Sequence, residues 1–212
     1  MKKLVGLILG WVLVSLGSSG WAAQSIFDFG STNGLSGPVG SDHFSVSTNG
    51  LTLTAYGFNA DNSLHGLFWK QGGPDEQGIG LTNTLDTELT LIGGTSIANY
   101  IQIDVSQVTN FPSAQIRGQS VTDGEEFNVF GSNTKGVIGT LIATGLTNEN
   151  SFVNIPDWGQ YGFISVAVTP QGSTRPSDNL LMDAIAVIPE PGVLSLVLAG
   201  IVGLGLLRHR AR

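Results

Sequence analysis

The stretch Leu51-Thr52-Leu53-Thr54-Ala55-Tyr56-Gly57-Phe58 alternates apolar and polar side chains, as a strand does when one of its faces is buried. It follows directly on Asn49-Gly50. An Asn-Gly pair is a strong turn signal between two strands, because both residues tolerate positive φ. The sequence therefore predicts a β-hairpin in which Leu51–Phe58 pairs with His43–Ser47.

Short apolar runs separated by turn residues continue along the chain, and no segment has the spacing of a long amphipathic helix. Regularly spaced short strands favour an all-β fold, which we expect to be an antiparallel β-sandwich or jelly roll. The other expected strands are Ser25–Phe29, Gly66–Lys70, Glu88–Ile92, Tyr100–Val105, Ser113–Ser120, Glu126–Phe130, Thr140–Thr144, Ser151–Ile155, Phe163–Val168 and Leu180–Val187.

Two of these strands predict which side chains form the core. Ile101, Ile103 and Val105 share one face of their strand, and Ile164, Val166 and Val168 share one face of theirs. We expect loops at 30–38, 59–64 and 71–78, and a single short helix near Val105–Asn110.

Both ends of the chain have the composition of targeting segments. Lys2-Lys3, the uncharged run Leu4–Leu16 and the small residues before Ala23 are typical of a secretory signal peptide, residues 1–22. An uncleaved anchor is the alternative. Removing both ends leaves one domain, residues 23–188.

The C-terminal segment, residues 189–212, begins with Pro189-Glu190-Pro191. Prolines end a strand because they lack a backbone donor. The uncharged run 192–207 then predicts one transmembrane helix, and the basic tail 208–212 carries Arg208, Arg210 and Arg212, which favour the cytoplasmic side.

The order Pro-Glu-Pro, apolar helix and arginine cluster resembles the PEP-CTERM sorting signal of exported bacterial proteins. The resemblance implies that an exosortase-type membrane enzyme processes the chain at Pro189, Glu190 and Pro191. It also implies a precursor anchored in the inner membrane, followed by delivery to the cell surface or the extracellular space. An ordinary C-terminal anchor is the alternative.

Residues 23–188 are strongly acidic, with four Lys or Arg side chains against 15 Asp or Glu side chains, a formal charge of −11 compared with −7 for the whole chain. Such a charge repels nucleic acid, so we expect no nucleic-acid partner. The chain has no cysteine, which excludes a thiol nucleophile and a disulfide.

A second, less specific resemblance runs through the exported part. Segments 75–81, 124–133, 161–166 and 180–185 are similar to recurring segments of PEP-CTERM proteins. The last two also resemble the closing strands of galactose-binding-like and carbohydrate-binding β-sandwiches. The resemblance implies a surface or matrix protein associated with exopolysaccharide or biofilm.

No catalytic motif occurs around His43 or His65, so we expect no enzyme activity. The competing class is a secreted carbohydrate-active hydrolase that uses paired carboxylates. Calcium is a second hypothesis, since loop carboxylates suit this cation, with solvated acidic turns as the alternative. The candidate calcium ligands are Asp75, Glu76, Asp123 and Glu125.

Sugar binding would use exposed aromatic rings as stacking surfaces. Trp158 lies in an expected loop with Tyr161 close by, and both are candidates for such a platform. The alternative is that Trp158 packs on the core, which we also expect for Trp69. The sequence thus predicts a non-enzymatic exported protein and does not identify its ligand.

Overall fold

A computed structural model of the chain describes residues 24–30, 36–73, 75–90, 99–121, 125–147, 150–168 and 179–190. The signal peptide expected at 1–22, the helix expected at 192–207 and the basic tail lie outside these residues. Ser25–Ile188 is one of two compact units into which the chain divides. No helix among the described residues is long and apolar enough to cross a membrane.

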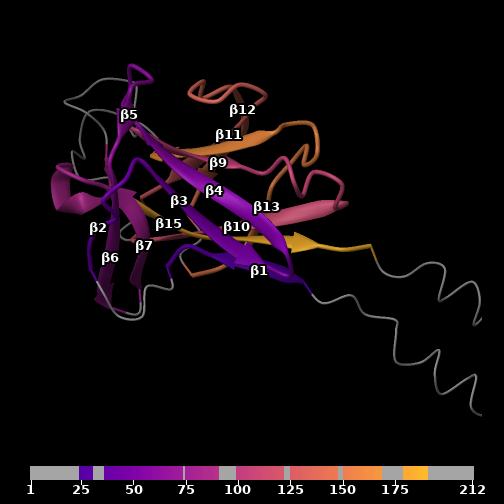
Figure 1. Ribbon diagram of the computed structural model, residues 1–212, viewed down its shortest axis with the longest axis horizontal. Helices are drawn as coiled ribbons and strands as arrows, with labels where there is room; N and C mark the ends of the chain where they lie inside the picture. Colours follow the sequence, from indigo (N-terminus) through magenta and orange to yellow (C-terminus); the bar gives the residue numbers. More distant parts are fainter. Residues whose placement is uncertain are drawn as a thin grey trace, which may run out of the picture. The chain divides into compact units, whose positions relative to one another are not determined.

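The domain is all-β, as predicted, and its strands form two antiparallel sheets (Figure 1). The first sheet has the order β13 (Val153–Asn154), β10 (Ser113–Gln119), β15 (Asn179–Ile188), β7 (Glu76–Leu81), β6 (Leu67–Gly73) and β2 (Gly37–Pro38), and β15 also pairs with β1 (Ser25–Asp28) and β8 (Leu89–Thr90). The second sheet has the order β12 (Thr140–Leu146), β11 (Phe127–Ser132), β14 (Phe163–Val168), β9 (Tyr100–Asp104), β4 (Leu51–Phe58) and β3 (His43–Thr48), with β5 (Leu64–His65) paired to β4.

The expected hairpin is confirmed. Thr48 pairs with Leu51, so Asn49 and Gly50 form a two-residue turn, and both have positive φ (54° and 77°). This backbone matches the turn that an Asn-Gly pair favours between strands. The hairpin places His43 and Tyr56 opposite each other on one face of the second sheet.

The main core lies between the two sheets, which makes the domain a β-sandwich. Buried side chains of the first sheet, such as Ile79, Ile116 and Ile185, belong to one cluster with Leu53 and Ile101 of the second. The predicted core faces are confirmed. The buried side chains are those of Ile101, Ile103 and Val105, at and just after β9, and those of Ile164, Val166 and Val168 in β14.

The outer face of the second sheet is covered as well, which the alternating pattern does not predict. Gln102 is completely buried, and its side-chain amide donates to Val137 O at 2.9 Å while its carbonyl accepts from Gly136 N at 2.7 Å. Phe58 stacks on Tyr100 beneath the same connection, with ring centroids 5.1 Å apart. The β11–β12 connection therefore closes a second, smaller core.

The short strands β2 and β5 begin inside the loops expected at 30–38 and 59–64, and two longer expectations are wrong. Residues 71–78 are not a loop, since β6 continues to Gly73 and β7 begins at Glu76. Strand propensity does not predict β7, because the strand contains Gly78 and Gly80. A side chain does not fit at Gly80, where a Cβ would lie 2.1 Å from Thr87 O. Residues 105–110 form turns instead of a helix, with Val108 N bonded to Val105 O.

Candidate functional site

The Pro-Glu-Pro motif starts where the sandwich ends. Ile188 still pairs with Ser113 of β10, and Val187 pairs with Ala114 and with Ser25 of β1. Pro189 follows at once and is half-buried, whereas Glu190 is exposed. Pro191, Arg208, Arg210 and Arg212 lie outside the described residues. The backbone pairing of β15 therefore ends at Ile188, the residue before the motif.

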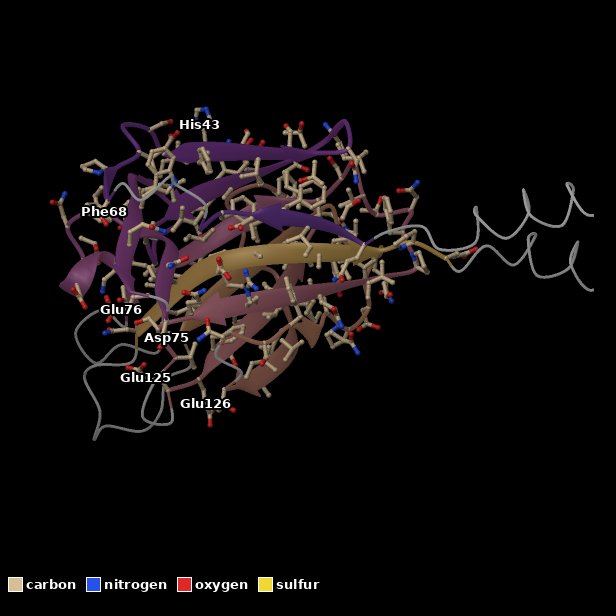
Figure 2. All side chains as sticks on the ribbon, turned by 90° about the horizontal axis from the view of Figure 1, so that it is seen from below. His43, Phe68, Asp75, Glu76, Glu125 and Glu126 are labelled. Carbon is tan, nitrogen blue, oxygen red and sulfur yellow. The ribbon has the colours of Figure 1, made fainter. Side chains whose placement is uncertain are left out.

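The candidate calcium ligands have separate partners. Asp75 Oδ1 accepts from Asn150 Nδ2 at 2.7 Å, Glu76 Oε2 lies 3.6 Å from Lys70 Nζ, and Glu125 Oε1 accepts from Asn179 N at 3.2 Å. Figure 2 shows Asp75, Glu76 and Glu125 toward the same end of the domain. Asp123 is outside the described residues.

No group of three or more acidic or histidine side chains suited to a metal ion occurs in the part of the chain that the structure describes. Calcium usually takes six to eight oxygen ligands, several of them carboxylates. Because each described candidate is engaged by a different side chain or backbone group, these residues alone do not assemble such a shell.

The two candidate platform residues are both partly buried. Trp158 packs against the main core, and its indole N–H is buried without a hydrogen-bond partner. Tyr161 also packs against this core, and its ring lies on Gly131, where a Cβ would come within 2.2 Å of the ring. Trp69 packs on the core as expected and meets Phe44 edge to face. The loop thus holds its aromatic rings against the sandwich.

A buried carboxyl that the sequence did not single out is Glu88. Its Oε1 accepts from Lys70 Nζ and from Ser120 Oγ, the latter at 3.0 Å, while Oε2 is buried without a hydrogen-bond partner. Burial raises the pKa of Glu88, and Lys70 opposes this shift. For Lys70, burial disfavours the charge, but the hydrogen bonds that Lys70 donates to Asp86 and Glu88 outweigh this effect and raise the pKa of Lys70.

A second buried carboxyl, Asp183, lies on β15 and is only 2% exposed. Arg117 Nε donates to Asp183 Oδ2, and Gln119 Nε2 donates to the same oxygen at 3.3 Å. Burial raises the pKa of Asp183 to about 6, against the opposing effect of Arg117. Glu88 and Asp183 are thus both buried, and each is paired with a cation.

An open pocket of about 500 Å³ lies elsewhere, where the β2–β3 connection meets the start of β6. Its lining residues are Pro38, Gly40, Ser41, Asp42, Gly66, Leu67 and Thr82. His43 follows this lining segment, and Figure 2 shows it well away from Asp75, Glu76 and Glu125. The pocket is therefore distinct from the acidic end of the domain.

Beside the pocket, Ser41, Asp42 and His43 are bonded but do not form a hydrolytic triad. Ser41 Oγ and Asp42 Oδ1 lie 2.9 and 2.8 Å from the same ring nitrogen, His43 Nδ1. In a triad the serine hydroxyl bonds to one ring nitrogen and the acid bonds to the other. The first nitrogen receives the serine proton, and the acid orients the ring. Here Asp42 and Ser41 compete for one position.

Sequence reasoning missed this pocket because its residues come from three separate segments, each an ordinary turn or strand end. The buried carboxyls did carry a signal. Asp183 interrupts the apolar run 180–187, and a charge inside such a run indicates a buried partner, which is Arg117.

Comparisons with protein-family models, curated proteins and solved structures found no match for this chain.

Proposed function

We propose that the chain is a non-enzymatic, exported surface or extracellular-matrix protein, sorted through a C-terminal PEP-CTERM signal and associated with exopolysaccharide. In this proposal the signal peptide leads the chain to the inner membrane, and the C-terminal helix holds it there. An exosortase-type enzyme then acts at Pro189-Glu190-Pro191. The narrower description of the domain as jelly-roll-like is supported by consecutive strands that lie in different sheets, such as β9 and β10 or β14 and β15.

The observation that carries the proposal is the sequence order at the C-terminus, joined to the end of β15. A processing enzyme needs an extended, accessible peptide, and Pro189-Glu190 follow directly on the last paired residue, with Glu190 exposed. The motif therefore begins directly after the last residue of β15.

A non-enzymatic role is supported by the state of the carboxyls. Glu88 and Asp183, the two buried carboxyls with raised pKa values, are 0% and 2% exposed, and each is held by a cation. A glycoside hydrolase needs two carboxyls that flank the substrate. The hydrolase alternative is tested by incubating the protein with diverse polysaccharides, because release of soluble sugars would contradict our proposal.

Mass spectrometry of the natively expressed surface protein tests the sorting step. We expect a chain that ends near Pro189 and lacks residues 192–212. Replacing Glu190 by Gln should leave the membrane precursor unprocessed, whereas Glu126→Gln, a change in the sandwich, should not affect processing. An intact Arg212 in the mature surface protein would exclude sorting.

A further inference from the structure

The pocket between the β2–β3 connection and β6 is fixed by backbone hydrogen bonds. Val39 N donates to Leu67 O and Leu67 N donates to Ser41 O, both at 3.0 Å, and Thr82 N donates to Gly66 O at 2.9 Å. These bonds join the segments that line the pocket. Its shape is therefore set before any ligand arrives, as in most small-molecule sites.

The pocket presents oxygen atoms of a particular kind. Asp42, Ser41 and Thr82 line it with oxygen-bearing side chains, and Pro38 and Leu67 line it with apolar surface. Asp42 Oδ1 is anchored by His43, and this hydrogen bond lowers the pKa of Asp42, so the carboxylate is charged near neutral pH. Such a group accepts hydrogen bonds from hydroxyl donors.

Physical chemistry narrows the class of ligand. The charge of −11 over residues 23–188 repels phosphates and other anions. One carboxylate is too little for a divalent cation, which needs several oxygen ligands. A wholly apolar ligand would cover the Asp42 carboxylate and the neighbouring hydroxyls without bonding to them, which costs free energy. A neutral ligand with adjacent hydroxyl groups meets all three conditions.

We propose that this pocket binds a neutral sugar unit, with the Asp42 carboxylate accepting hydrogen bonds from adjacent sugar hydroxyls. The volume of about 500 Å³ lies within the range of small-ligand pockets, roughly 300 to 1,000 Å³. This inference deepens the exopolysaccharide association proposed above and rests on it. It places the sugar-binding contact in this pocket and not at Trp158 and Tyr161.

Two glycines offer a matched pair of variants. Gly40 lines the pocket with φ of +79°, and Gly50 lies in the hairpin turn with φ of +77°, and a Cβ at either meets nothing within 4 Å. Asparagine tolerates this backbone region better than other side chains. Gly40→Asn therefore adds a side chain at the pocket wall, and Gly50→Asn makes the same backbone change elsewhere.

A second pair tests the carboxylate. Asp42→Asn removes the charge in the pocket, while Asp61→Asn removes another exposed carboxylate, which is bonded to Ser63 and lies outside the lining. Because a hydrogen bond to a charged group is stronger than one to a neutral group, we expect Asp42→Asn to weaken sugar binding about tenfold.

The experiment measures binding of glucose, galactose and mannose oligosaccharides to the full chain, kept in a detergent without a sugar headgroup. Saturation-transfer NMR and titration calorimetry report binding, and thermal melting confirms that each variant is folded. We expect Gly40→Asn and Asp42→Asn to lose affinity while Gly50→Asn and Asp61→Asn keep it.

Binding that survives both pocket variants would overturn the inference, as would equal losses in the control variants. Loss only in Trp158→Ala would assign the contact to the aromatic loop instead. Absence of binding to every neutral oligosaccharide would also overturn it. None of these outcomes depends on C-terminal processing. The sorting step is tested separately, by the mass spectrometry described above.

Discussion

At the scale of single residues, Asp183 predicts how stability depends on pH. Its carboxyl has a pKa of about 6 in the folded domain and about 4 when unfolded. Between these values the folded state holds a proton that the unfolded state releases, so the free energy of unfolding falls as pH rises from about 4 to 6. Two pKa units correspond to about 3 kcal/mol at most.

Chemical denaturation at several pH values checks this prediction. Asp183→Asn should remove the part of the slope between about pH 4 and 6 that this carboxyl supplies. Asp61→Asn is the control, because the hydrogen bonds from Ser63 lower the pKa of Asp61 and place its contribution below that range. If the slopes of the wild-type chain and Asp183→Asn coincide, the folded pKa of Asp183 is not raised.

At the scale of the element, β15 protects the peptide bonds that precede the sorting motif. Val187 is completely buried and pairs with strands on both sides. A protease binds an extended peptide, so a cut before Pro189 requires β15 to separate from β1 and β10. We therefore expect processing, and trimming by a broad-specificity protease, to stop at residue 189 or later.

Mass spectrometry after limited proteolysis of the full chain gives the boundary directly. Trimming in mild denaturant serves as the control, because opening of the sheet should then allow cuts before residue 188. A native product that ends at residue 186 or earlier would contradict the protection by β15.

The elements also show what the sequence could and could not predict. The β3–β4 hairpin was predictable because Asn49-Gly50 and the alternation after it are local signals. β7 was not, since Gly78 lies against the backbone of Met182 in β15 and Gly80 against that of Thr87, contacts that form only when the chain folds back on this strand. The pocket escaped for the same reason, because Ser41, Gly66 and Thr82 meet only in the folded domain.

At the scale of the whole molecule, the acidic charge predicts sensitivity to salt. Self-repulsion destabilises a compact state of high net charge, and salt screens it. Raising NaCl from about 0.01 to about 0.15 M should therefore raise the melting temperature. A melting temperature that does not change with salt would show that repulsion is unimportant.

Calcium is tested in the same measurement. Because Asp75, Glu76 and Glu125 have separate partners, we expect calcium chloride to act like sodium chloride of equal ionic strength. A further rise in the melting temperature with calcium, absent with magnesium, would instead identify a calcium site completed by residues outside the described part, such as Asp123.

The pairing of β1 with β15 has a consequence for how the domain forms. A chain is made from its N-terminus, so β15 is the last of the described strands to be synthesised, yet it pairs with β1, β7, β8 and β10. The first sheet therefore lacks its central strand until residue 188 has been made. Until then β1, β7, β8 and β10 have edges that are not yet paired with β15. Such late, long-range pairing makes folding slow and exposes these strands to aggregation.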